Sequence, residues 1–246
     1  MNIERLVNVG EIENAVLSVC RHIENRYENR INWHEFSEEQ LWFELVSCIL
    51  GSRVNYETAN ACTFYLFNQG LLSPLNIVKN PNKFEQRMVY ELSKPIFPPL
   101  NENNGRCYPF SKSKSNYIVR TAVNVYKTND TTLKDILLCC QDGYEARNSL
   151  KEIAVGIGYK QASLFLRNIS YSKNLAILDS HVMRYMVLLN LVEKDKAFRL
   201  SSKNEYVKLE RNLQIYALSN KKSIAALDMA IWVVMRLIQK EYLIWQ

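Results

Sequence analysis

LKEIAVGIGYKQAS, at residues 150–163, places two glycines around a single apolar residue, between two segments of helical periodicity. Glycine tolerates the positive φ and the close backbone approach that a tight turn between two helices demands. The amide groups at the start of the second helix then point outward, where they can hold a phosphate. The stretch therefore predicts a hairpin between helices, with Gly156 and Gly158 binding a phosphate.

Two chemically active side chains follow this hairpin. Lys160 lies two residues after the second glycine, and Asp179 lies 19 residues further on, in the segment LDSH at 178–181. An amine is a nucleophile for a sugar carbon, and a carboxylate stabilises the positive charge that develops there. Together with a phosphate-binding hairpin, the pair indicates chemistry on a nucleotide in DNA. Taken singly, each has a simpler interpretation: Lys160 contacts a phosphate, and Asp179 caps the next helix.

The composition is that of an ordinary globular chain. The 246 residues are 48% hydrophobic and 23% charged, enough to bury a core in one domain or in two closely packed lobes. No apolar run approaches the roughly 20 residues that span a bilayer, and no apolar block follows the N-terminus as in a secretion signal. We therefore expect a cytoplasmic protein.

The six cysteines show no metal-ligand spacing, and most lie among apolar residues, so we expect buried thiols in a reducing compartment. The net charge of +6 is uneven: residues 145–246 hold 16 Lys and Arg against 9 Asp and Glu, whereas residues 1–144 hold 15 against 16. The positive excess lies in the part with the hairpin, as binding to a polyanion requires, although a solvated basic surface gives the same count.

The apolar pattern is helical almost throughout, which predicts an all-α fold. The segment SEEQ at 37–40 is typical of a capping box and begins a helix that runs to about residue 50. Further helices are predicted near 55–69, 82–93, 113–128, 132–141, 146–155, 159–170, 180–192, 203–219 and 222–240. A polar loop at 101–117 carries Arg106, Lys112 and Lys114, which either contact a phosphate or are solvated; we favour solvation.

Two segments carry a family resemblance, GIGYKQASLFLRN at 156–168 and AILDSHVMR at 176–184. They resemble the helix-hairpin-helix (HhH-GPD) DNA glycosylase superfamily, in particular its type-2, archaeal-style 8-oxoguanine DNA glycosylases. Weaker similarity extends to residues 41–52, 108–119 and 227–232, so the resemblance covers most of the chain. It implies a single domain over residues 1–246, built from two packed all-α subdomains with the active-site cleft between them.

The resemblance also implies the chemistry. Lys160 is then the nucleophile that forms a Schiff base with the sugar, in a bifunctional enzyme that excises 8-oxoguanine or a related base and cleaves the strand as an AP lyase. Asp179 is its electrostatic partner. His181 matches a family position that contacts the phosphate near the flipped nucleotide, and a surface histidine on a capped helix fits nearly as well.

Three further residues match family positions near the extruded base. Arg53 stands where the family usually carries an Asn or Gln that fills the gap in the duplex, or it is an exposed arginine at a helix end. Trp232 offers an aromatic face to the base or belongs to the core, the commoner place for a tryptophan on an apolar helix. Asp228 lies near the base pocket or is a charge at a helix N-terminus.

No cofactor is expected. The four-cysteine iron–sulfur cluster of other branches of the superfamily is excluded because no cysteine follows Cys140, and no zinc site is offered. In relatives the hairpin holds a monovalent cation against a DNA phosphate, which the resemblance extends to this chain. The expected partner is double-stranded DNA with a damaged or modified base, bound by a monomer in base excision repair.

The resemblance departs at the C-terminus, where KEYLIWQ at 240–246 stands in place of a short basic tail that helps to read the oxidised base. This departure leaves the base that is excised open. One alternative is a glycosylase for a different modified base, including one with a role in defence. The other is a DNA-binding protein that uses the hairpin without catalysis.

Overall fold

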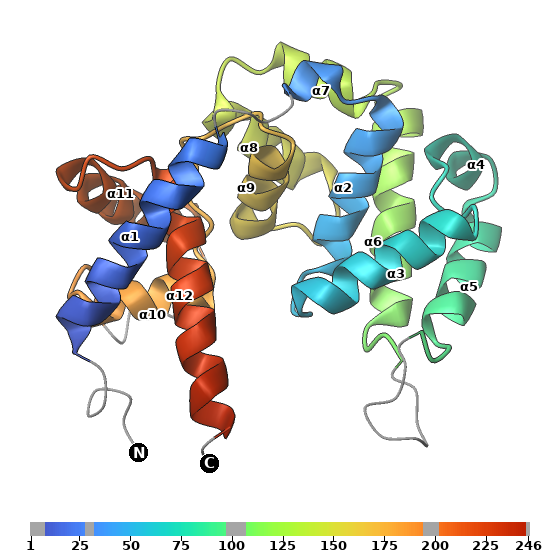
Figure 1. Cartoon of the computed structure of the whole chain (residues 1–246). Coiled ribbons are helices and arrows are strands. Elements are labelled where there is room, and N and C mark those ends of the chain that lie inside the picture. The colour runs from blue at the N-terminus through green and yellow to red at the C-terminus, as the bar shows by residue number, and fades with distance from the viewer. Residues whose placement is uncertain (1–7, 28–31, 97–106, 194–201, 245–246) are drawn as a thin grey trace. The chain divides into compact units, whose positions relative to one another are not determined.

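The computed structural model describes residues 8–27, 32–96, 107–193 and 202–244, and these ranges contain helices and no strand (Figure 1). The predicted all-α fold is therefore confirmed. The chain divides into two compact units. We call residues 32–169 the central unit, and residues 1–31 with 170–246 the terminal unit. The single domain with a cleft between its lobes stays a prediction.

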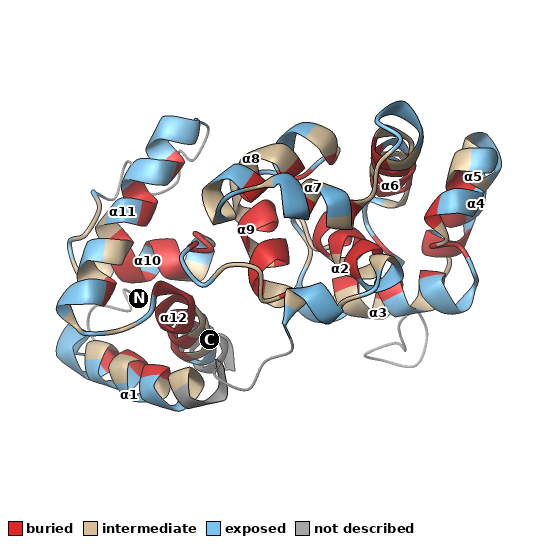
Figure 2. Ribbon diagram, turned by 90° about the horizontal axis from the view of Figure 1, so that it is seen from above, coloured by how far each residue is buried: buried red, intermediate tan, exposed pale blue. Residues whose placement is uncertain are grey.

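The central unit is built around one buried helix, α2 (Glu38–Leu50), which packs against four other helices. Its N-terminus is fixed by the expected capping box, in which Gln40 N donates to Ser37 Oγ at 3.2 Å and Ser37 N donates to Gln40 Oε1 at 2.8 Å. The partners are α3 (Tyr56–Asn68), α6 (Ser111–Val123), α7 (Leu133–Cys139) and α9 (Tyr159–Asn168). Figure 2 shows the buried positions gathered along α2 and α9.

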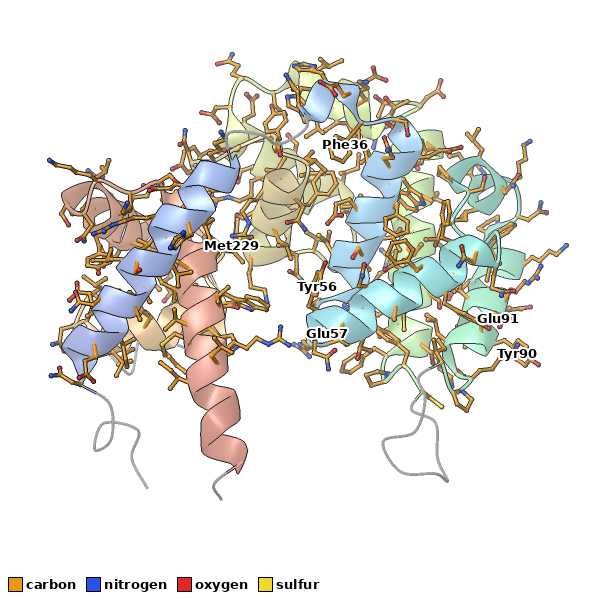
Figure 3. The ribbon with its side chains drawn as sticks, in the orientation of Figure 1. Phe36, Tyr56, Glu57, Tyr90, Glu91 and Met229 are labelled. Atoms are coloured by element: carbon orange, nitrogen blue, oxygen red, sulfur yellow. The ribbon has the colours of Figure 1, made fainter. Side chains whose placement is uncertain are left out.

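The unit also contains α4 (Pro74–Lys79), α5 (Pro81–Leu92), α8 (Gly143–Ile153) and a π-helical turn, Asn124–Thr128, that continues α6. A 3₁₀ turn, Trp33–Glu35, precedes α2. Glu91 of α5, labelled in Figure 3, accepts hydrogen bonds from the Tyr65 hydroxyl of α3 at 2.7 Å and from Lys94 Nζ at 2.8 Å. The bond from Tyr65 holds α5 against α3, and the bond from Lys94 joins Glu91 to the residues that follow α5.

The terminal unit contains α1 (Val9–Tyr27), α10 (Ser180–Leu188), α11 (Lys203–Ser219) and α12 (Ile224–Ile244). The helix α12 packs against the other three. Its contact with α1 is apolar, because Ile12, Val16 and Cys20 recur every four residues along one buried face of α1. An ion pair of 2.8 Å between Lys222 and Glu24 closes one end of this contact.

The sequence pattern missed α1 and α4, and it placed the other helices within a few residues of their bounds. The predicted loop at 101–117 is wrong from Ser111 onward, because α6 begins there. Lys114, which we expected to be solvated, is one of the buried residues of α6. Burial against neighbouring helices outweighs the local polarity of the segment SKSKS in this case.

The prediction that most cysteines are buried is also wrong. Three are buried (Cys20, Cys48, Cys62), Cys107 and Cys139 are exposed, Cys140 is intermediate, and all six are free thiols. Cys139 is the last residue of α7 and Cys140 is its C-cap. None of the helices in the described ranges combines the length and the hydropathy that crossing a membrane requires.

Candidate active site

The predicted hairpin is present between α8 and α9, and the structure constrains its two glycines differently. Gly156 has φ +78°, and a Cβ atom at this position would overlap the ring of Tyr117 on α6. Gly158 has φ −102°, and a Cβ atom there would meet nothing within 4 Å. The fold itself thus requires glycine at 156 only. At 158 the open space leaves room for a close approach from outside the unit.

Two hydrogen bonds fasten the hairpin to the α6 segment. Val155 N donates to Thr121 Oγ1 at 2.9 Å, and Asn124 Nδ2 donates to Ile153 O at 3.0 Å. Both bonds use backbone groups at the turn, which no helix satisfies. The position of the turn is therefore set by α6 as well as by its own glycines.

Arg147 joins the two helices of the hairpin. It is 2% exposed, its Nη1 donates to Ser163 Oγ of α9 at 3.3 Å, and its guanidinium lies over the rings of Tyr144 and Tyr159, 5.2 and 5.7 Å from their centroids. A planar cation between two rings gains favourable contact with both. This arrangement stiffens the pair of helices that presents the turn.

Lys160 is the second residue of α9 and is partly exposed. Among the described residues no side chain caps this helix, whose N-cap is Gly158, so the amide groups of its first turn are left without a side-chain partner. The inner face of α9 is anchored on α2, where Gln161 Nε2 donates to Cys48 O at 3.1 Å and Asn168 Nδ2 donates to Glu44 Oε1 at 2.7 Å. The lysine thus stands on a helix that is fixed along its length.

The neighbouring thiol does not compete with this amine. Cys48 is buried, and burial, together with the adjacent carboxylate of Glu44, raises the pKa of its thiol well above the usual value. A neutral, enclosed thiol is a packing group and a poor nucleophile. Within the described residues, no three His, Cys, Asp or Glu side chains come together as metal ligands.

Asp179, in the terminal unit, is the N-cap of α10. Its Oδ1 accepts from both His181 N and Val182 N at 2.9 Å. Within the part of the chain that the structure describes, its Oδ2 accepts no hydrogen bond. The capping interpretation is therefore correct, and it is compatible with a catalytic role because one oxygen holds the carboxylate in place and leaves the other available.

The segment before Asp179, which is neither helix nor strand, is held by three side chains from other helices. Ala176 N donates to Glu210 Oε1 at 2.8 Å, and Ile177 N donates to Asp228 Oδ2 at 2.7 Å. The Tyr206 hydroxyl donates to Ala176 O at 2.8 Å and accepts from Leu178 N at 3.3 Å.

The sequence interpretation named Asp228 for another role and missed Glu210 and Tyr206. A signal was present, because Glu210 interrupts the buried face that Tyr206, Leu209 and Leu213 form on α11. A carboxylate at a core position needs a buried donor, here a backbone amide.

Comparison with known proteins identifies the family of this chain. A family model described as 8-oxoguanine DNA glycosylase (Ogg-HhH) matches residues 23–222. The chain belongs to this family. It is 32% identical over 197 residues to the 8-oxoguanine DNA glycosylase/AP lyase of Sulfolobus acidocaldarius, covering 80% of this chain and 82% of the relative. The protein of that name from Saccharolobus solfataricus is 31% identical, covering 87% and 90%.

Solved structures share the fold. The Methanocaldococcus jannaschii 8-oxoguanine glycosylase/lyase in complex with a 15mer DNA containing 8-oxoguanine aligns with TM-score 0.68 and 23% identity, over 91% of this chain and 93% of that one. The 8-oxoguanine DNA glycosylase of Thermotoga maritima aligns with TM-score 0.64 and 24% identity, over 91% and 93%. The helical architecture is therefore that of known glycosylases.

Three further predicted site residues, His181, Asp228 and Trp232, lie in the terminal unit. Burial lowers the pKa of His181 below its usual value, against the opposite effect of Asp179. Its Nδ1 is buried without a hydrogen-bond partner in the described structure. Asp228 is buried and bound to the Ile177 amide as above. Trp232 is partly exposed, with Arg236 4.7 Å from its ring centroid, so the core interpretation is wrong for it.

Arg53 follows α2 in the central unit, where it is exposed and has φ +67°. It lines a hollow of about 200 Å³ together with Gly156 of the hairpin. The other lining residues are Ser52, Phe110, Ser113, Lys114 and Tyr117. The structure thus brings the predicted gap-filling arginine beside the hairpin, and it adds Lys114, which the sequence interpretation had assigned to solvent.

Exchange of the two hairpin glycines for alanine separates folding from DNA binding. We expect Gly156→Ala to lower the free energy of unfolding by more than about 2 kcal/mol, because it adds a clash to a left-handed backbone. Gly158→Ala fits its open position, so we expect a loss of about 1 kcal/mol or less. Urea unfolding measures both, and equal losses would contradict the assignment. In a duplex-binding assay, Gly158→Ala weakens affinity despite its stability.

The hydrogen bonds from Tyr206 to the segment before Asp179 predict that loss of the tyrosine hydroxyl destabilises the protein. Tyr206→Phe leaves the Ala176 carbonyl and the Leu178 amide without their partner in a buried place, so we expect a loss of about 1–3 kcal/mol in the free energy of unfolding. Tyr90→Phe is the matched control, because that tyrosine is exposed and the change is expected to stay within about 0.5 kcal/mol. Indistinguishable unfolding midpoints for the two variants would contradict this structural role of Tyr206.

Proposed function

We propose that this protein is a bifunctional DNA glycosylase/AP lyase that removes 8-oxoguanine from double-stranded DNA, with Lys160 as the nucleophile and Asp179 as its electrostatic partner. One observation carries the proposal. Lys160 stands in the first turn of α9, directly after the hairpin and beside amide groups that no side chain caps. A DNA strand whose phosphate binds these amides therefore brings its sugar within reach of the amine.

The residue types fit the reaction step by step. The neutral amine of Lys160 attacks C1′ of the nucleotide, the bond from C1′ to the base breaks, and the base leaves with the bonding electrons and takes up a proton. The sugar then opens to an imine with the lysine, and loss of a 2′ proton expels the 3′ phosphate. A hydroxyl nucleophile would not form this imine. The ionised Asp179 stabilises the positive charge that develops on the sugar.

The substrate is proposed from the relatives. Proteins that share about a third of their residues with this chain carry the name 8-oxoguanine DNA glycosylase/AP lyase, and a structural neighbour is bound to DNA containing 8-oxoguanine. The other site residues keep their expected places in this proposal. Gly156, Gly158 and His181 contact phosphates of the strand, and Asp228 and Trp232 contact the extruded base. A monovalent cation at the hairpin carbonyls completes the proposed phosphate contact.

Borohydride trapping tests the nucleophile. With a duplex that carries 8-oxoguanine opposite cytosine, we expect a covalent protein–DNA adduct from the wild type and none from Lys160→Gln, since reduction traps only the imine. Lys151→Gln is the matched control, because Lys151 is an exposed lysine of the same hairpin and its loss leaves the imine chemistry intact. An adduct from Lys160→Gln would refute the assignment. If only a duplex with a different modified base gave an adduct, that base would be the substrate in place of 8-oxoguanine. If the protein bound DNA and gave no adduct with any base, it would be a non-catalytic DNA-binding protein.

Asp179→Asn tests the electrostatic partner without removing the helix cap, since asparagine is as good an N-cap as aspartate. We expect base release in single turnover to slow by about 100- to 1000-fold, as when a charge-stabilising group is lost from other enzymes. Affinity for an uncleavable abasic-analogue duplex is expected to change by less than about threefold, because a carboxylate contributes little to binding a polyanion. Equal losses in binding and in turnover would contradict the role.

A further inference from the structure

Lys114 is buried, and the described residues give it no counter-ion. It lies in the first turn of α6 and is 5% exposed. Within the part of the chain that the structure describes, its ammonium takes part in no hydrogen bond or ion pair. The contact that it does make is with the ring of Tyr117, whose centroid is 5.5 Å from Nζ. An aromatic face offsets only a small part of the desolvation of a cation.

The surroundings add a second positive charge. Lys114 and Arg53 line the same hollow, which is bordered by two serines and two aromatic rings and, among the described residues, by no carboxylate. Burial and, after it, the charge of Arg53 lower the pKa of Lys114 to about 8. The free protein thus holds two cations close together where neither stabilises the other.

The backbone of Arg53 is unfavourable as well. Its φ of +67° is in the left-handed region, which side-chain-bearing residues rarely occupy. Glycine would adopt this conformation at less cost, yet the chain keeps a long cationic side chain at the turn. Strained backbone and unpaired buried charge at one hollow are typical of a site that is completed by a ligand.

We propose that this hollow binds one phosphodiester group of a DNA backbone, with Lys114 and Arg53 supplying the positive charge and Ser52 and Ser113 supplying hydroxyl donors. The inference rests on the proposed function, because DNA is the source of the phosphate. Two cations without an acid favour an anion over a neutral base. The volume of about 200 Å³ is also below the roughly 300–1,000 Å³ of pockets that enclose whole ligands. It therefore suits a phosphodiester and not an extruded nucleoside.

This phosphate site is separate from the one at the start of α9. Gly156 borders the hollow, whereas none of its lining residues belongs to α9. The two sites are thus neighbours that share the turn of the hairpin.

The site also couples binding to pH. A bound phosphate favours the charged ammonium, so Lys114 takes up a proton on binding whenever the free protein has lost it. Affinity is therefore full below the pKa of about 8 and falls as the pH rises above it. The charged and titratable neighbours that the described structure gives Lys114 are Arg53, from the turn after α2, and Tyr117, on its own helix.

The test measures affinity for a duplex with an uncleavable abasic analogue, opposite each of the four bases, by fluorescence anisotropy. Lys114→Met is compared with Lys112→Met, which removes an exposed lysine of the same helix, and with Lys114→Arg, which keeps the charge at all pH values. We expect Lys114→Met to weaken binding about 10- to 100-fold and to lower the salt slope by about one. Lys112→Met changes affinity by less than about threefold, and Lys114→Arg retains affinity and loses the decline between pH 7 and 9.5.

The outcomes separate this inference from the proposed function. Equal affinities of wild type and Lys114→Met, with borohydride trapping intact, would overturn the phosphate site alone. A loss that depends on the opposite base would also overturn it, since a phosphate contact carries no sequence information. Thermal unfolding supplies a further check: removal of an unpaired buried charge leaves Lys114→Met at least as stable as the wild type, and a lower unfolding midpoint would contradict the argument. Absence of duplex binding and of trapping in the wild type would instead refute the proposed function.

Discussion

The contact between the backbone of Gly156 and the ring of Tyr117 is the constraint on which the central unit's functional surface depends. Only a residue without a side chain allows the turn to lie this close to α6. The bond from Val155 N to Thr121 Oγ1 then fixes the position of the turn along that helix. From this one contact follow the direction of α9, the uncapped amides of its first turn and the place of Lys160. Bonds from α9 to α2 make the arrangement rigid.

Local patterns predicted those parts of the fold that are decided within a few residues. The hairpin, the capping box at Ser37 and the cap at Asp179 are such features, because each depends on residues two to five positions apart. Lys114 was placed wrongly since its burial depends on elements far away in the sequence, including the turn with Ser52 and Arg53, about which the segment SKSKS holds no information. The roles of the individual site residues in catalysis and binding stay predictions.

The segment before Asp179 illustrates a second limit. It is buried and lies in no helix, and the described residues give it no neighbouring strand, so the amides of residues 176–178 need side-chain partners. Glu210 and Asp228, which lie 34 and 51 residues from their donors, take the place of a strand. Pattern analysis recognises strands by alternating apolar and polar residues and helices by their longer period, and a buried segment whose amides are satisfied by carboxylates follows neither rule. Its geometry therefore emerges only from the folded chain.

The terminal unit has a consequence for biosynthesis, because it is assembled from two stretches that the entire central unit separates. The buried face of α1 packs against α12, which the ribosome makes last among the described helices. At about 5–20 residues per second, α1 waits on the order of ten to forty seconds for this partner. The central unit, made from one continuous stretch, has its full sequence earlier. Folding of the terminal unit is thus limited by the rate of translation, although an all-α protein is otherwise suited to rapid folding. The helix α1 needs protection from aggregation during that interval.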